Sequence, residues 1–305
     1  MLICLKSNDC ILSMRKLITY LFLFLCVTMI SAQNKSVSTK KLSTLDVGVV
    51  FSGGGALGLA HIGAIKAMEE YGIEPKYVGG TSMGAIIGVM YAAGYSADEI
   101  MEIVKDRRLY KVGHLMSWRS ALRSNGMSSQ KTLLRELDEF IPYNSFDSLE
   151  RKFMVCVTNV ETAEPAYRSK GDNLKEFVAA SASIPAVFES IVIDEVRYVD
   201  GGMMDNLPVK ALRKQFGKSK MKVIAIDVLP FIENFEAKNF LDMAKWTLRV
   251  FQYKNAEPNR ASADCLIDCW ALKKYHEFDF KYYKEIYQYG YDAMKAKLES
   301  IEKAD

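Results

Sequence analysis

The sequence has few of the residues that would indicate a disulfide scaffold or a metal centre. Only three of its 305 residues are histidine and six are cysteine. Cys4, Cys10 and Cys26 lie near the N-terminus, and the remaining cysteines are odd in number and lack framework spacing. A bridge between Cys265 and Cys269 is an alternative that the sequence leaves open. The histidines do not cluster with the cysteines, so no metal or other cofactor is expected.

A large excess of one charge is also missing. The chain has 40 Lys and Arg against 37 Asp and Glu, a net charge of +3. Some of that excess belongs to residues 1–32, so the rest of the chain is close to neutral. Proteins that bind nucleic acid usually carry a clearly basic surface. We therefore expect no nucleic-acid partner, and we find no internal repeat or low-complexity tract.

Residues 1–32 are typical of a signal peptide. Arg15 and Lys16 form a basic region, residues 17–30 are apolar, and Ala32 offers a small residue for cleavage. A retained membrane anchor is the alternative, although a spanning helix needs about 20 apolar residues. The start could be Met1 or Met14. We expect export to the periplasm or the medium, with or without membrane association, and a polar linker at 33–44.

After the linker, strand-like apolar runs alternate with helical periodicity. Strands are expected at 46–51, 77–79, 152–160, 195–199, 222–228 and 264–272, and helices at 57–71, 83–93, 130–140, 173–181, 208–216, 241–252 and 281–303. This alternation predicts an α/β fold with a mainly parallel central sheet. Residues 214–305 are expected to complete the same α/β domain.

A glycine-rich loop, Ser52-Gly53-Gly54-Gly55-Ala56-Leu57-Gly58, follows the first strand and opens a helix. Its spacing fits G-x-G-x-x-G, but the acidic residue that a dinucleotide site needs after the next strand is missing. Backbone N–H groups at a helix N-terminus also suit a developing negative charge. Gly53, Gly54 and Gly55 are therefore candidates for an oxyanion hole. A tight turn that allows close helix packing is the structural alternative.

The second glycine motif, Gly80-Thr81-Ser82-Met83-Gly84, fits the G-x-S-x-G nucleophile elbow. Gly80 and Gly84 permit the sharp turn that such an elbow needs. The motif lies between a strand-like run and an apolar helix, which favours Ser82 as a nucleophile over a structural serine.

A nucleophilic serine needs a proton acceptor, and two candidates remain. Asp200 ends a strand and precedes Gly201 and Gly202, which leave its carboxylate unobstructed. His276 would complete the serine–acid–histidine order of the α/β-hydrolases. However, only one strand and one helix precede Ser82, and His276 lies among charged residues typical of a solvated loop. Asp200 is therefore the favoured base.

Residues 105–123 combine six basic side chains with apolar ones, including Trp118. This composition fits a solvated helix and loop. It also fits a lid or a membrane-surface patch that contacts anionic lipid, and the sequence leaves both interpretations open.

Taken together, the two glycine motifs and Asp200-Gly201-Gly202 make the chain resemble the patatin-like phospholipases, a family of serine–aspartate dyad lipid acyl hydrolases. The resemblance covers 49–213 and includes the stretches 181–188 and 205–208 around the aspartate. It implies a three-layer fold and an acyl-enzyme formed on Ser82, with Asp200 accepting the proton. One departure is Leu57, where the family often has Arg or Lys.

The resemblance implies a lipid acyl-ester substrate of the phospholipase A or lysophospholipase type. It does not fix the lipid class or the ester position. Two other functions stay open: a non-catalytic module for lipid binding or envelope assembly, and a general esterase or thioesterase that uses His276.

Overall fold

The structure is a computed structural model that describes residues 46–106, 127–185, 187–233 and 235–303. The expected signal peptide at 1–32, the linker at 33–44 and most of the segment 105–123 lie outside these residues. Within the described ranges, no helix is both long and apolar enough to cross a membrane.

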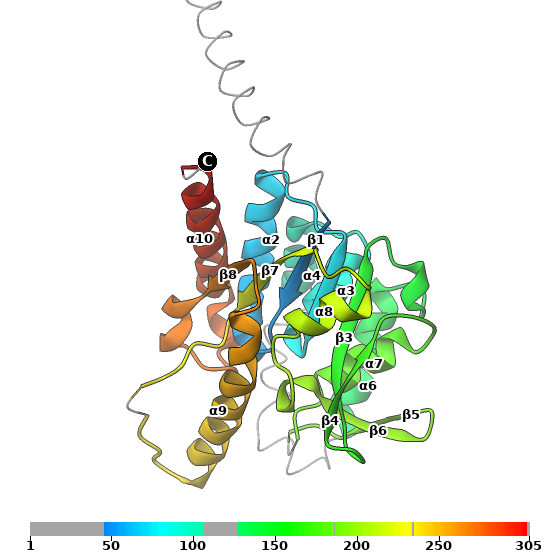
Figure 1. The fold of residues 1–305 in the computed structure, drawn as a ribbon. Helices are drawn as coiled ribbons and strands as arrows, with labels where there is room; N and C mark the ends of the chain where they lie inside the picture. The colour runs from blue at the N-terminus through cyan, green and yellow to red at the C-terminus, as the bar shows by residue number, and fades with distance from the viewer. Residues whose placement is uncertain (1–45, 107–126, 186, 234, 304–305) are drawn as a thin grey trace, which may run out of the picture. The chain divides into compact units, whose positions relative to one another are not determined.

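A single eight-stranded sheet forms the centre, in the order β5-β6-β3-β2-β1-β7-β8, with β4 paired to β3 (Figure 1). Its strands are β1 (Val47–Phe51), β2 (Tyr77–Thr81), β3 (Lys152–Asn159), β4 (Glu164–Arg168), β5 (Ile191–Ile193), β6 (Val196–Asp200), β7 (Lys222–Asp227) and β8 (Cys265–Asp268). The five strands from β3 to β8 along this order are parallel, whereas β4, β5 and β6 pair antiparallel. The expected mainly parallel α/β sheet is confirmed.

Helices cover both faces of the sheet, as the apolar side chains on both sides of its central strands require. In β1, Phe51 packs against Tyr91 of α3, and Val50 joins a cluster with Leu212 of α8. The α-helices are α2 (Ala60–Glu70), α3 (Met83–Ala92), α4 (Ala97–Asp106), α6 (Met127–Phe140), α7 (Leu174–Ser181), α8 (Val209–Gln215), α9 (Phe240–Arg260) and α10 (Tyr283–Glu302). Short 3-10 helices lie at Gly55–Leu59, Phe146–Ser148, Gly201–Met203, Trp270–Lys274 and Phe280–Tyr282. The result is the three-layer arrangement that the resemblance implied.

The first and last α-helices among the described residues, α2 and α10, are in direct backbone contact through two glycines. A Cβ atom on Gly290 would lie 1.9 Å from the Ala60 carbonyl oxygen, and one on Gly63 would lie 2.0 Å from the Tyr287 carbonyl oxygen. No side chain fits at either position, so the sequence pairs glycine with backbone on both helices. Helix α10 therefore packs directly against α2.

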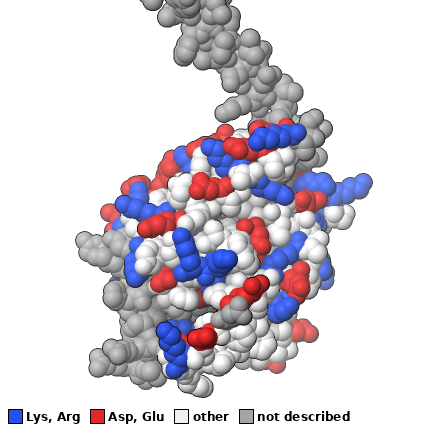
Figure 2. Space-filling view, turned by 90° about the vertical axis from the view of Figure 1, so that its left-hand side faces the viewer, with Lys and Arg blue, Asp and Glu red and all other residues white. Residues whose placement is uncertain are grey.

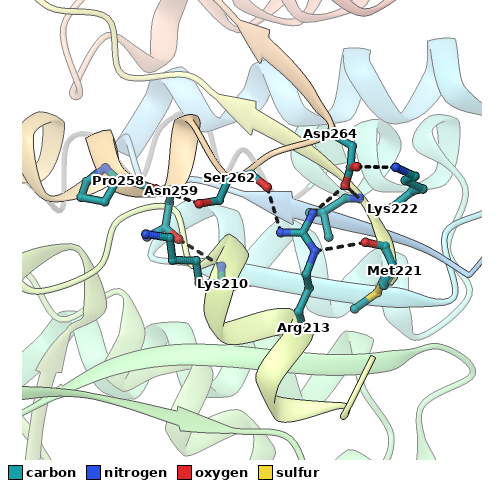
Figure 3. A network of polar contacts seen from close by, with 9 residues as sticks. Lys210, Arg213, Met221, Lys222, Pro258, Asn259, Ser262 and Asp264 are labelled. Carbon is teal, nitrogen blue, oxygen red and sulfur yellow. Dashed lines mark hydrogen bonds and ion pairs between the residues drawn. The ribbon is translucent and has the colours of Figure 1, made fainter. Parts of the chain in front are cut away.

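Arg213 of α8 joins two segments that follow the 49–213 region (Figure 3). Its guanidinium donates to the carbonyl oxygens of Met221 at 3.1 Å and Ser262 at 2.8 Å, and pairs with Asp264. Lys222 pairs with the same carboxylate at 2.8 Å. One arginine thus holds together the start of β7 and the turn between α9 and β8.

Several elements differ from the expected ones. Residues 97–106 form α4, and 164–168 and 191–193 form the short strands β4 and β5. Of the expected strand at 264–272 only Cys265–Asp268 is extended, and a 3-10 helix follows. A strand of this spacing separates Cys265 and Cys269 by about 13 Å, well beyond disulfide reach. Both are free thiols.

Helix α9 is longer than its periodicity predicts. It was expected at 241–252 but continues to Arg260, with Pro258 inside its last turn. Proline removes one helical hydrogen bond and usually ends a helix. Here the last turns are held from outside, because the side chains of Asn255 and Asn259 bind the chain around Asp205. Tertiary contacts therefore override a local stop signal.

Candidate active site

Ser82 occupies a strained turn between β2 and α3. Its backbone has φ 54° and ψ −125°, a conformation that non-glycine residues rarely adopt. The turn is possible because both flanking residues are glycines, which have no side chain where the backbone comes close. A Cβ on Gly80 would lie 2.4 Å from the Gly84 carbonyl oxygen, and one on Gly84 would lie 2.3 Å from the Phe51 carbonyl oxygen. This backbone conformation directs the Ser82 side chain out of the sheet and into the site.

A second serine, Ser181, stabilises the turn at Ser82 through hydrogen bonds. The Ser82 backbone N–H donates to Ser181 Oγ at 2.9 Å, and the Ser181 hydroxyl donates to the Cys156 carbonyl oxygen at 2.6 Å. Ser181 is fully buried at the end of α7. Sequence reasoning placed it only in a family-like stretch, because its partner Ser82 lies 99 residues away.

Asp200 ends β6 and is fully buried. Its Oδ1 accepts the Gly202 N–H at 2.7 Å, and its backbone carbonyl accepts the Thr158 hydroxyl at 2.9 Å. Its Oδ2 has no hydrogen-bond partner in the described part of the chain. The carboxyl group is therefore held by one oxygen, and the other oxygen is open to a proton.

Burial sets the acidity of Asp200. Removal from water raises the pKa of the carboxyl group to about 7, although the Ser82 hydroxyl and the Gly202 N–H both lower it. The Ser82 hydroxyl is thus close enough to interact with the carboxyl, while Oδ2 still lacks a regular hydrogen bond. A carboxyl with this pKa can accept and release a proton near neutral pH.

The glycine loop follows β1, where the sheet order changes direction between β1 and β7. Ligands in open α/β sheets bind at such a point, outside the carboxyl ends of the strands. Gly53 N–H donates to the Asn206 carbonyl oxygen at 3.3 Å, so it is used within the fold. No acceptor is found among the described residues for the N–H groups of Gly54 and Gly55. These two remain as candidate oxyanion donors.

The C-terminal part of the chain supports the glycine loop. The Ala56 N–H donates to the Glu277 carbonyl oxygen at 2.8 Å. Gly55 has a positive φ of 55°, and a Cβ atom there would collide with the same carbonyl oxygen. The Glu277 side chain pairs with buried Arg249 of α9 at 2.9 Å, and Arg249 also donates to the Pro230 carbonyl oxygen. The loop therefore depends on residues that lie about 200 positions later in the chain.

A cavity of about 150 Å³ joins these groups. Ser82, Gly54 and Gly55 lie in its wall, together with the apolar side chains of Val187 and Leu248. Asp200 is not in the wall, but its carboxyl interacts with the hydroxyl of Ser82, which is. The cavity can hold part of an apolar group next to a nucleophile.

Helix α9 carries a row of amides that holds the aspartate loop. Asn255 donates to the Gly202 carbonyl oxygen at 2.8 Å and accepts the Asn206 N–H at 2.9 Å. Asn259 donates to Asp205 Oδ1 at 3.0 Å and accepts the Lys210 N–H at 3.0 Å. Sequence reasoning missed both residues. Their four-residue spacing was the available signal, since it places two amides on one helix face.

Neither His61 nor His276, the two histidines among the described residues, lines the cavity. His276 is exposed, and its neighbours Glu277 and Phe278, rather than His276 itself, line the cavity. His61 is buried in α2, where its Nε2 lies 2.8 Å from the Ser52 carbonyl oxygen and burial lowers its pKa to about 4. Among the described residues no group of three or more His, Cys, Asp or Glu could hold a metal ion.

Known proteins resemble the chain in sequence and fold. The family model described as patatin-like phospholipase matches residues 49–213. "Lysophospholipase nte1" of Aspergillus terreus is 29% identical over 86% of this chain, and that of Emericella nidulans is 31% identical over 86%. In both cases the chain spans 19% of the relative's length. VipD from Legionella pneumophila has a TM-score of 0.51 at 16% identity, covering 84% of this chain and 67% of VipD.

Proposed function

The chain belongs to the patatin-like phospholipase family, and we propose from this that it hydrolyses acyl esters of lipids, with the phospholipase A and lysophospholipase class as its reaction type. The observation that carries the proposal is the pairing of Ser82 in a strained elbow with a buried carboxyl that has one unbonded oxygen. The names of the fungal relatives support a lipid substrate, although the chain spans only a fifth of their length.

In the proposed mechanism Ser82 Oγ attacks the acyl carbonyl carbon, and its proton moves to Asp200 Oδ2. The carbonyl oxygen becomes an oxyanion facing the N–H groups of Gly54 and Gly55, and each such donor is worth ~3 kcal/mol of barrier. Asp200 returns the proton to the leaving alcohol, which leaves an acyl-enzyme on Ser82. Water, deprotonated by Asp200, then attacks the acyl carbon. The bond between Ser82 Oγ and the acyl carbon breaks, Asp200 returns the proton to Ser82 Oγ, and the fatty acid is released.

Two substitutions test the dyad on a soluble acyl ester. Ser82→Ala should abolish release of the acid and labelling by a fluorophosphonate, because the attacking oxygen is gone, while the melting temperature stays similar. Asp200→Asn should be nearly as severe, since an amide cannot accept the proton. His276→Ala is the matched control and should stay close to wild-type activity.

The same measurements decide between the other functions. Loss on His276→Ala with activity kept by Asp200→Asn would make the protein a triad esterase or thioesterase. Activity of Ser82→Ala equal to wild type would remove the nucleophile assignment. Wild-type protein that binds lipid vesicles but releases no acid from any ester would be the non-catalytic module.

We also propose that residues 1–32 direct export to the periplasm or the medium and that 105–123 contacts anionic membrane. The support is their composition: a basic and apolar leader, and basic side chains among apolar ones. N-terminal sequencing of the protein from the producing cells should begin at Gln33. A start at Met1 or Met14 would mean that the segment is retained.

Charge reversal tests the membrane segment. Arg107, Arg108, Arg119 and Arg123 changed to Glu should weaken binding to anionic vesicles strongly, because each base contributes about 1 kcal/mol near such a surface. The binding should also lose its salt dependence. Hydrolysis of a soluble ester should change little. Equal loss on soluble and vesicle substrates would show that the segment shapes the site instead.

A further inference from the structure

Helix α9 presents three large apolar side chains to solvent. Phe240, Met243 and Phe251 are exposed by 88%, 48% and 59%. Residues 3 and 11 positions apart lie on the same side of an α-helix, so these three form one row, about 16 Å long. We call this row the α9 stripe. Exposed Thr247 interrupts the row between Met243 and Phe251. Large exposed apolar groups gathered on one helix face indicate a surface that binds something else.

Charge does not explain what the α9 stripe binds. Nearby Lys238 and Lys254 are exposed, but Asp242 lies beside the first and Glu257 pairs with the second at 3.2 Å. The face of the molecule in Figure 2 likewise shows basic and acidic side chains interspersed, with no field of one sign. The partner must therefore be attracted mainly by the apolar side chains.

The same helix forms a wall of the catalytic cavity. Leu248 and Gln252 line the cavity, and they lie on the side of α9 next to the α9 stripe. Met203 also lines the cavity, and its neighbour Met204 is 41% exposed. A lipid that reaches Ser82 has to leave its bilayer or micelle through the mouth of this cavity. Because one side of α9 lines the cavity and the adjacent side carries the α9 stripe, contact of the α9 stripe with the lipid phase would bring the cavity close to its substrate.

We propose that the α9 stripe docks the protein on the surface of a bilayer or micelle by inserting its apolar side chains between the lipids. This inference rests on the proposed function, since the lipid substrate is the reason to choose a lipid surface as the partner. It differs from the contact proposed for 105–123, because docking by the α9 stripe needs no anionic lipid and is insensitive to salt.

The test uses the full chain and vesicles of pure phosphatidylcholine, which carry no net charge. Binding is measured by co-sedimentation for the wild type and for Phe240→Ser with Phe251→Ser. The double variant should bind more weakly, on the order of tenfold for each phenylalanine removed. Raising the salt concentration about tenfold should leave wild-type binding unchanged.

Trp270→Ser is the matched control, because it removes an exposed aromatic side chain from outside α9. It should bind as the wild type does, and all three proteins should hydrolyse a soluble ester equally. Unchanged vesicle binding by the double variant, or an equal loss in Trp270→Ser, would overturn the proposal. So would a wild-type dimer that the double variant turns into a monomer, since the α9 stripe would then bind a second copy.

The outcome separates this proposal from the proposed function. If the wild type hydrolyses esters and the double variant binds vesicles as well as the wild type does, the proposed function stands and the docking proposal is wrong. Stripe-dependent vesicle binding without hydrolysis of any ester would do the reverse.

Discussion

Asp200 is the residue on which the pH dependence should turn. As a base it acts only as the carboxylate, and its pKa of about 7 means that this form appears as the pH rises through neutrality. We therefore expect kcat/KM for a soluble ester to rise about tenfold per pH unit below pH ~7 and to level above it. The measurement is a pH–rate profile from pH ~5 to ~9.

Asp205 provides the control for this profile. It is also buried, and burial raises its pKa to about 6, but its carboxylate binds Tyr167 and Asn259 rather than the site. Asp205→Asn should therefore keep the midpoint near 7. A midpoint that disappears in this variant would assign the profile to Asp205.

The sign of the stability effect is opposite to that of activity. Because the folded pKa of Asp200 lies above its unfolded value of ~3.9, the folded state loses stability as the pH rises from ~4 to ~7. Asp200→Asn carries no such charge. Its free energy of unfolding should exceed that of the wild type by roughly 2–4 kcal/mol at pH ~8, and the difference should vanish near pH ~4. Urea unfolding at the two pH values measures it.

Single residues of the site differ in how far the sequence predicts them. Ser82 and Asp200 lie in short contiguous motifs. The glycines of these motifs are needed because a side chain there would collide with nearby backbone. The structure brings both together with Gly54 and Gly55, while Gly53 N–H bonds within the fold. Ser181 has no such local motif, because its function depends on a hydroxyl meeting a backbone N–H from a distant segment.

Among the elements, α9 contacts both the cavity and the aspartate loop. Asn255 binds two backbone groups of the aspartate loop, and both Gly202 and Asn206 are buried. Asn255→Ala would leave two buried groups unpaired, at a cost of about 1–3 kcal/mol each. We expect a lower melting temperature and kcat for a soluble ester reduced about tenfold or more, because the loop carrying Asp200 loses its support.

Lys254→Ala is the comparison for Asn255→Ala, since Lys254 is the preceding residue, is exposed and pairs with Glu257 alone among the described residues. It should leave both values unchanged. If Asn255→Ala lowers the melting temperature alone and keeps kcat, Asn255 stabilises the fold without positioning the base.

The sequence predicted the elements that show either a clear apolar run or a strong helical periodicity. The parallel strands β1, β2, β3 and β7 are apolar runs, and their existence follows from burial on both faces. Short edge strands such as β5 are not predictable in this way, because Ile191–Ile193 is extended only through its pairing with β6. The extension of α9 past Pro258 has the same origin in tertiary contacts.

On the scale of the molecule, residues from 45 onward form one unit that includes β7, β8 and α10. A chain that begins at residue 45 should therefore keep the melting temperature and the soluble-ester kcat of the whole protein. The thiols Cys156, Cys265 and Cys269 are unpaired, so a reductant should not change the melting temperature either. A fall of the melting temperature in the shortened protein would show that the fold extends into residues 1–44.

The contact between Ala56 and Glu277 also fixes an order of events during synthesis. The glycine loop leaves the ribosome early, but its acceptor arrives only after more than two hundred further residues. Helix α2 waits in the same way for Gly290 of α10. Contacts this distant in sequence form late in folding. A nascent chain therefore already contains Ser82 while its glycine loop still lacks the Glu277 carbonyl, so the proposed ester hydrolysis should begin only after residues 277–290 have been synthesised.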